Sequence, residues 1–291
     1  MIKGKIWKWF SFKDMLIIDD DIFVSYTEEQ KEDCWNTSIL RGEINFQSIT
    51  FKNFFSPSYC IHSSNNLDNE FNAHQSGGRI VKSDGESIFF TIGDYRSRYL
   101  AQDEKSVNGK IIEINLNDQS FKIVTLGHRN PQGLYYDKKR KSLIETEHGP
   151  FGGDEINIIE KDRIDRGEKL NYGWPVVSAG EHYGGKTEKN QLKYQKYPLY
   201  KSHQKYGFIE PIKSFVPSIG ISEIVKIGDN KYLVGSMNHQ SLYIVMIDDK
   251  KDFQILDKIF LGERVRDIVL NKKKVYLFLE NSASIGVMSF Q

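Results

Sequence analysis

The feature that most constrains this chain is a series of short runs rich in β-branched and aromatic residues, each ended by Gly, Pro, Asn or Asp. Apolar and polar side chains alternate in several runs, as in Tyr243–Asp248, which is typical of half-buried strands. A helical period does not persist for more than about two turns anywhere in the sequence. The chain is therefore predicted to be all-β.

The expected strands fall into groups of about four, and each group spans roughly 40–55 residues, a repeat length typical of propeller blades. A blade cannot bury both of its faces alone, so blades stack into a ring. Five groups begin near Met15, His74, Gln132, Gly220 and Arg264. The last group has three strands, and a strand expected at Lys5–Phe12 is either its fourth strand or the end of a further blade.

Residues 160–207 interrupt this pattern. The segment is rich in Lys, Tyr, Gly and Gln and has little strand periodicity. We expect it to be a long loop excursion over one face of a single propeller domain that spans residues 1–291. Long loops inside compact domains are uncommon and often functional.

Charge and hydropathy argue against two kinds of partner. The sequence has 40 Lys and Arg against 39 Asp and Glu, a formal net charge of +1, whereas nonspecific nucleic-acid binding requires a basic surface. The sequence lacks an apolar run of the roughly 20 residues that a membrane helix requires. Residues 1–10 show no pattern of a signal peptide.

The two cysteines, Cys34 and Cys60, are too few to form a structural zinc site. They either pair as one disulfide, as in exported proteins, or remain two thiols.

Charged side chains concentrate in loops that are dense in Gly, Pro and Asn. Such loops span Leu126–Leu134, Glu145–Asn157 and Asn171–Pro175. Gly, Pro and Asn end strands and form the turns between them. Charged groups crowded into such turns indicate a site built on loops over a rigid scaffold.

Seven motifs occur in a fixed order: His74–Arg79, Thr91–Asp94, Gly127–Gly133, Glu147–Pro150, Gly153–Asn157, Asn171–Pro175 and Arg264–Asp267. Together they resemble the soluble pyrroloquinoline quinone (PQQ) sugar dehydrogenases of the glucose/sorbosone dehydrogenase family, from about Ile22 to the end of the chain. The resemblance implies a six-bladed propeller with PQQ and calcium over the ring. It also implies oxidation of an aldose sugar to its lactone.

The resemblance assigns the base to His74 and an orienting carboxylate to Asp94. A neutral imidazole, with an unperturbed pKa of about 6.5, suits the removal of a hydroxyl proton. The resemblance also places Arg129, with Asn130 beside it, at the quinone carbonyl that accepts hydride. Taken alone, His74 is better interpreted as a surface loop histidine, and only the ordered set of motifs favours the base.

The cofactor carboxylates are assigned to arginines. A guanidinium fork matches a carboxylate, and Arg264 and Arg266, two apart on an expected strand, point to the same face. The alternative for this pair is a set of exposed salt bridges.

The resemblance also implies metal ligands. The successive carbonyls of Gly149 and Pro150 bind the calcium that polarises PQQ, and Glu155 and Tyr172 match a second, structural ion site of some members. Calcium takes about six to eight oxygen ligands. The alternative for Glu155 is a charged residue at the start of a strand.

The chain departs from the family at two places. A blade that precedes Met15 in the family, with a glutamine that touches the cofactor, has no counterpart here, and Asn238 stands where the family has a cofactor-binding lysine. We expect about five blades. A start lost from a longer gene would explain both the missing blade and the missing export signal, since the family works outside the cytoplasm. Location, oligomeric state and the sugar are left open.

Two other functions fit the same features. An inactive propeller would bind a sugar or a protein without turnover. A calcium-dependent lactonase-like hydrolase would need several side-chain ligands around the channel, for which Asp94, Asn130 and Glu155 are the candidates.

Overall fold

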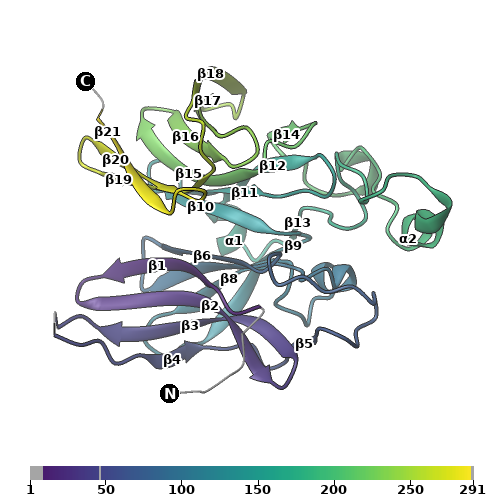
Figure 1. The fold of residues 1–291 in the computed structure, drawn as a ribbon, viewed down its shortest axis with the longest axis horizontal. Coiled ribbons are helices and arrows are strands. Elements are labelled where there is room, and N and C mark those ends of the chain that lie inside the picture. Colours follow the sequence, from purple (N-terminus) through teal and green to yellow (C-terminus); the bar gives the residue numbers. More distant parts are fainter. Residues whose placement is uncertain (1–8, 46, 290–291) are drawn as a thin grey trace.

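The computed structural model describes residues 9–45 and 47–289 and shows five sheets arranged around a common axis (Figure 1). The first sheet contains β1 (Phe12–Ile18), β2 (Asp21–Lys31), β3 (Cys34–Glu43), β4 (Lys52–Phe55) and β5 (Ile61–His62). The second contains β6 (Gly77–Lys82), β7 (Ser87–Ile92), β8 (Lys110–Asn115) and β9 (Phe121–Leu126), with β13 (Leu170–Asn171) added in parallel to β9.

The remaining three sheets follow in chain order. The third contains β10 (Pro131–Asp137), β11 (Ser142–Glu147), β12 (Asp154–Glu160) and β14 (Lys213–Phe215). The fourth contains β15 (Ile221–Gly228), β16 (Lys231–Ser236), β17 (Ser241–Ile247) and β18 (Phe253–Phe260). The fifth contains β19 (Val265–Asn271), β20 (Lys274–Leu279) and β21 (Ser284–Ser289).

The all-β prediction and the five groups of strands are confirmed. The fifth sheet has three strands in the described part of the chain, and there β21 pairs only with β20. Half of the strand expected at Lys5–Phe12, residues 5–8, lies outside the described residues. Residues 9–11 are not in a strand, and Phe12 begins β1 instead.

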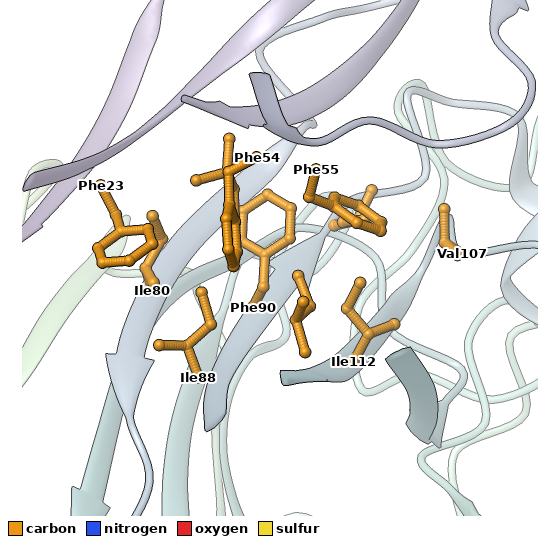
Figure 2. Packing of buried hydrophobic residues seen from close by; sticks show 11 residues of the cluster. Phe23, Phe54, Phe55, Ile80, Ile88, Phe90, Val107 and Ile112 are labelled. Carbon is orange, nitrogen blue, oxygen red and sulfur yellow. The ribbon is translucent and has the colours of Figure 1, made fainter. Parts of the chain in front are cut away.

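The blades are held together by apolar side chains packed between adjacent sheets (Figure 2). Phe23 from β2 and Phe54 from β4 meet edge to face at 5.0 Å. Phe55 meets Phe90 from β7 of the next blade at 6.0 Å. Each such fully buried side chain contributes about 1.5–3 kcal/mol through removal of apolar surface from water.

The excursion at residues 160–207 contains short ordered elements, which are α1 (Lys161–Asp165), β13, η2 (Glu188–Asn190), α2 (Gln191–Lys196) and η3 (Gln204–Tyr206). It is anchored to the loop before β6, because the Tyr197 hydroxyl donates to Asp68 Oδ1 at 2.7 Å and Lys193 pairs with Glu70. Figure 1 shows the α2 end of this excursion reaching outward from the ring.

Cys34 and Cys60 form a disulfide with their Cα atoms 5.3 Å apart, which settles the choice that the sequence left open. The bond ties β3 to the segment before β5. Among the described residues, the helices are too short and polar to cross a bilayer.

Each innermost strand carries a β-bulge near its start. The register shifts lie at Phe12/Asp14 in β1, Gly77/Ile80 in β6, Pro131/Gly133 in β10, Ile221/Ile224 in β15 and Val265/Asp267 in β19. A bulge adds a residue without a cross-strand partner and re-aims its side chain. The five bulges therefore turn polar side chains toward the axis at one end of the ring.

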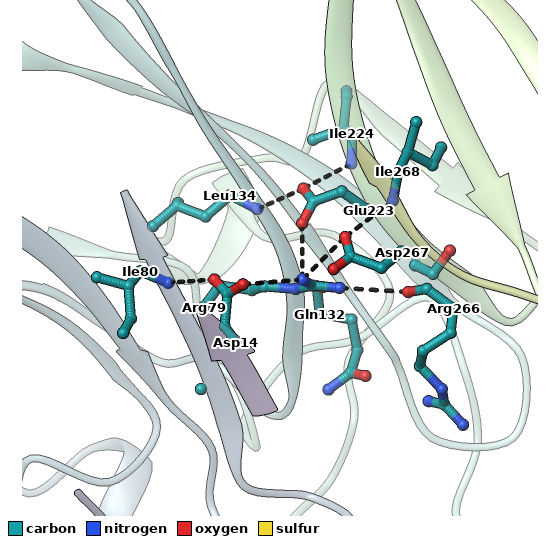
Figure 3. A network of polar contacts seen from close by, with 12 residues as sticks. Asp14, Arg79, Ile80, Gln132, Leu134, Glu223, Ile224, Arg266, Asp267 and Ile268 are labelled. Atoms are coloured by element: carbon teal, nitrogen blue, oxygen red, sulfur yellow. Dashed lines mark hydrogen bonds and ion pairs between the residues drawn. The ribbon is translucent and has the colours of Figure 1, made fainter. Parts of the chain in front are cut away.

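Arg79 from β6 lies where the innermost strands meet (Figure 3). Its Nη1 is 3.1 Å from Glu223 Oε2, 3.1 Å from Asp267 Oδ1 and 3.5 Å from Asp14 Oδ1. Its Nε donates to the Gln132 carbonyl at 2.5 Å. We call Asp14, Arg79, Glu223 and Asp267 the axial cluster, since it connects the five innermost strands.

Candidate functional site

A cavity of about 700 Å³ opens above the axial cluster, within the range of about 300–1,000 Å³ that is typical of ligand pockets. Five residues selected from the sequence line it, namely His74, Arg129, Asn130, Arg264 and Arg266. His74 lies in the loop before β6, Arg129 and Asn130 lie between β9 and β10, and Arg264 and Arg266 lie at the start of β19. The ring therefore brings together residues that are up to 192 positions apart, with His74 near the arginines as predicted.

The cavity lining is strongly cationic. Among the described residues that line it, six are Lys or Arg and one, Glu280, carries a carboxylate. Arg79 is balanced by the axial cluster, and Glu280 is shared by Arg264 Nε at 3.4 Å and by Arg266. The exposed-salt-bridge interpretation of this pair is therefore partly right, yet one carboxylate cannot balance the remaining cations. Such a cavity favours an anionic ligand.

His74 is exposed at the cavity, and its ring meets Trp9 edge to face at 5.6 Å. Partial burial, then the nearby charges of Lys13 and Arg266, lower the pKa of its imidazole. The ring is therefore neutral at neutral pH. Within the described part of the chain, its two nitrogens have no hydrogen-bond partner, so one can accept a proton from a ligand.

Asp94 does not contact the His74 ring, contrary to the prediction of an orienting hydrogen bond. It is fully buried, where Oδ2 accepts from Trp174 Nε1 at 2.8 Å and Oδ1 accepts from the Arg96 backbone N–H at 2.8 Å. Desolvation raises its pKa, opposed by Arg129. Asp94 is occupied because the excursion inserts Trp174 beside it, which strand-level reasoning could not foresee.

Arg129 is held at the wall of the cavity from several sides. Its backbone N–H donates to Glu147 Oε2 at 2.7 Å, and its Nη1 donates to the His148 carbonyl at 2.9 Å. With the Gln75 amide oriented to satisfy its neighbours, the Gln75 oxygen accepts from Arg129 Nη2 at 2.9 Å and from Arg96 Nε at 3.1 Å. This network fixes the guanidinium before any ligand arrives.

Asn130 is nearly buried and joins two blades. Its Oδ1 accepts from the Gly77 N–H at 3.2 Å and from Gln132 Nε2 at 3.0 Å. The residue also lines the large cavity.

Asn238 was predicted to bind the cofactor, but it lies outside the cavity lining. Its Nδ2 donates to the Ser218 carbonyl at 3.2 Å at an exposed position. The preceding residue, Met237, lines the cavity instead and contacts Arg264 through sulfur at 3.8 Å. A shift of one residue in a turn reverses which side chain faces the site.

Gly149, Glu155 and Tyr172 line a second, small cavity of about 10 Å³, comparable to the space of one water or ion. Arg129 borders both cavities. The Tyr172 hydroxyl donates to the Ile158 carbonyl, and its ring stacks on His128 at 4.9 Å. No described donor binds the carbonyls of Gly149 or Pro150.

Buried carboxylates concentrate at the small cavity, where Glu147 and Glu155 line it and Glu145 lies on the same strand as Glu147. Glu145 and Glu147 on β11 lie opposite Asn157 and Glu155 on β12, on one face of the sheet. Burial, then repulsion by Glu147, raises the pKa of both Glu145 and Glu155. Glu145 Oε1 has no partner in the described structure. Hard oxygen donors and unbalanced negative charge fit a calcium ion.

His128, Glu145 and Glu147 also lie close enough to share a cation. His128 is already bonded on both sides, by Thr125 Oγ1 at 2.8 Å and by Glu147 Oε1 at 3.1 Å. The three lactonase candidates, in contrast, do not converge. Asp94 is beneath the large cavity, Asn130 lines it and Glu155 faces the small one.

Sequence reasoning missed Lys13, Arg96, Gln132, His148 and Tyr183, which also line the large cavity. Arg96 and Arg129 lie at 5.5 and 5.9 Å from the Tyr183 ring, so the excursion adds an aromatic wall. Burial lowers the pKa of His148, whose Nε2 is 2.5 Å from the Ile221 carbonyl. Tyr183 gave no signal, since its segment lacks periodicity.

Comparison with known proteins agrees with this geometry. The family described as Glucose / Sorbosone dehydrogenase matches residues 17–287. Aldose sugar dehydrogenase YliI of Escherichia coli is 27% identical over 215 residues, covering 66% of this chain and 53% of its own. Quinoprotein glucose dehydrogenase B of Acinetobacter calcoaceticus is 35% identical over 136 residues, covering 36% of this chain and 27% of its own.

The solved apo structure of the soluble aldose sugar dehydrogenase from Escherichia coli has the same fold, with a TM-score of 0.77 and 21% identity over 97% of this chain and 83% of that one. The chain spans about half the length, or less, of the curated relatives it matches. The match to the family covers residues 17–287, which include the lining residues of both cavities except Ser11, Phe12 and Lys13. The chain therefore belongs to the glucose/sorbosone dehydrogenase family.

Proposed function

We propose that this protein oxidises an aldose sugar to its lactone with PQQ bound in the large cavity and calcium beside it. The observation that carries the proposal is the meeting of a neutral His74 with Arg129, Arg264 and Arg266 in one cationic cavity. The relatives named as an aldose sugar dehydrogenase and a quinoprotein glucose dehydrogenase support the same chemistry.

The cavity suits PQQ, a planar tricarboxylate. Arg264 and Arg266 come from the start of β19 and Arg129 from the loop between β9 and β10, so guanidiniums from two separate segments are available to the carboxylates of a flat ligand. When bound, PQQ supplies the hydride acceptor that amino acid side chains lack. The protein supplies binding, orientation and proton transfer.

His74 is the proposed base, taking the proton of the sugar C1 hydroxyl at a ring nitrogen. Its lowered pKa keeps it unprotonated at neutral pH, so it is ready to accept. Asp94 is a positioning residue. It accepts a hydrogen bond from the Gln75 amide, whose oxygen in turn accepts one from Arg129, and its carboxylate interacts with the Arg129 charge. Tyr183 offers an aromatic surface at the mouth of the cavity, where a sugar would enter.

Gly149 and Pro150 would hold the calcium ion through their carbonyls, next to Arg129. Glu155 and the cavity at Tyr172 would hold a second, structural ion. The buried carboxylates and the unpartnered carbonyls are the features of this chain that favour a hard cation there.

The test is dye reduction by the purified protein supplied with PQQ, Ca²⁺ and an aldose. We expect turnover that His74→Ala lowers by about 10²–10⁴-fold, the usual contribution of a general base. His62→Ala is the matched control, since His62 is exposed on β5, far from the lining residues. Absence of turnover with any aldose, or full activity of the His74 variant, would contradict the proposal.

A further inference from the structure

Two innermost strands begin with the same arrangement of a basic residue followed by aspartate. In β1, Phe12 pairs with Tyr26 and Asp14 with Ser25, which leaves Lys13 as the bulged residue. In β19, Val265 pairs with Leu279 and Asp267 with Phe278, which leaves Arg266 in the same place.

The aspartates of the two pairs point to one target. Asp14 and Asp267 both reach Arg79 Nη1, at 3.5 and 3.1 Å (Figure 3). The two strands occupy equivalent positions in their blades, and their aspartates converge on Arg79. The residues that precede these aspartates, Lys13 and Arg266, therefore lie at corresponding positions on the cavity side of the axial cluster. Both Lys13 and Arg266 line the large cavity, and each lowers the pKa of His74.

We propose that Lys13 is a ligand-binding residue that pairs with a carboxylate of the anionic cofactor, as the counterpart of Arg266 in the first blade. The inference rests on the proposed function for the nature of the anion. It adds a residue to the site that neither the motifs nor the resemblance assigns.

The aliphatic part of the Lys13 side chain packs against the backbone of Gly78. Gly78, at φ +117°, faces it so closely that a side chain at residue 78 would collide with the Cβ and Cγ of Lys13. Gly78 is itself fixed, because its carbonyl accepts from Ser25 Oγ at 2.5 Å and its N–H donates to Thr91 Oγ1 at 3.1 Å. The backbone thus leaves room for one long side chain directed at the cavity.

The Lys13 ammonium lacks an anion of its own. Among the described residues, none forms an ion pair with it, whereas Arg266 has Glu280. Burial, then the charge of Arg266, lowers its pKa to about 8. A carboxylate placed between Lys13 and Arg266 would relieve this repulsion and restore the solvation that the ammonium has lost.

The resemblance placed Asn238 where the family has a cofactor-binding lysine. Asn238 lies outside the lining of the cavity, whereas Lys13, near the other end of the chain, lines it. The chain therefore provides the cation from a different blade.

The test is the Kd for PQQ, measured by absorbance titration in the presence of Ca²⁺. Lys13→Met keeps the stem on Gly78 and removes the charge, so we expect the Kd to rise about tenfold or more, as for loss of a charge-assisted hydrogen bond. Lys13→Arg should keep most of the affinity. Lys52→Met is the control, since Lys52 is exposed on β4 of the same sheet.

Equal PQQ affinity of wild type and Lys13→Met would overturn this inference and leave the proposed function intact. Absence of PQQ binding by the wild type would overturn both. Melting temperatures establish that each variant is folded, and Lys13→Gln provides a second neutral variant should Lys13→Met fail to fold.

Discussion

Arg79 Nη2 donates a hydrogen bond to the carbonyl oxygen of Arg266 at 3.2 Å, so the centre of the ring holds the backbone of a cavity residue. The axial cluster therefore both links the innermost strands and positions the site. Around one guanidinium it gathers the buried carboxylate of Glu223 and the partly buried carboxylates of Asp14 and Asp267.

Replacing Arg79 with Met should destabilise the fold by about 3–5 kcal/mol, the usual cost of removing one partner from a buried ion pair. The free energy of unfolding from urea titration measures this. Arg41→Met is the control, because Arg41 pairs with Asp21 at a largely exposed position and should change stability by about 0–1 kcal/mol. Similar stabilities of the two variants would show that the axial cluster does not hold the ring together.

The axial cluster should also make stability depend on pH. Burial, only partly offset by Arg79, raises the pKa of Asp14 to about 6 and of Glu223 to about 8. The folded state therefore holds protons that the unfolded chain has released above about pH 4–5. This stabilisation is fully present below that pH and is lost as pH rises through 6 and then 8.

Glu223→Gln should flatten the fall in the free energy of unfolding between about pH 6 and 8, since each unit of pKa difference corresponds to about 1.4 kcal/mol. Urea unfolding at several pH values measures the slope. An unchanged slope would mean that Glu223 does not hold the proton.

Affinity for PQQ should fall as pH rises through about 8, because anion binding favours charged Lys13 and its pKa in the free protein is about 8. The groups around Lys13 are Arg266 of β19, His74 of the loop before β6, and Asp14 and Arg79 of the axial cluster. His74 is already neutral in this range, and the arginines do not titrate. Glu223 also titrates near pH 8, so the share of Lys13 is the part of the slope that disappears in Lys13→Met.

Calcium should raise the melting temperature, because an ion bound only by the folded state stabilises it by RT ln(1 + [L]/Kd), or about 2.7 kcal/mol at a hundredfold excess over Kd. Glu155→Gln should abolish most of this shift, since Glu155 faces the small cavity. Glu188→Gln, in an exposed part of the excursion, should keep it. An equal calcium shift in wild type and Glu155→Gln would place the ion elsewhere.

The sequence allowed most strands to be predicted because their signal is local. Runs of β-branched and aromatic residues predict strands with the bounds that β7, β8, β9, β11, β17 and β18 have in the structure. The same pattern predicts a strand at Ile209–Phe215, but only its last three residues pair with β12, since the earlier ones follow the end of the excursion. Periodicity shows which residues are apolar, but it does not show whether the edge strand of a sheet lies close enough to pair with them.

The site was predictable where motifs fixed single positions, and it was not where distant segments meet. His74, Arg129 and Arg266 share a cavity as expected. Asp94 took Trp174 as its partner because the excursion folds back over the ring. The repeat of Lys13–Asp14 and Arg266–Asp267 is visible in the sequence, but its meaning requires the bulges that align the two strands.

The most direct test of the central claim is a titration of the full chain with PQQ, followed by absorbance with and without Ca²⁺. The account predicts saturable binding of one PQQ per chain, tightened by Ca²⁺ and weakened by Arg129→Ala and Arg266→Ala. An absorbance change that does not saturate would contradict the account. Wild-type PQQ affinity in both the Arg129→Ala and the Arg266→Ala variants would also contradict it.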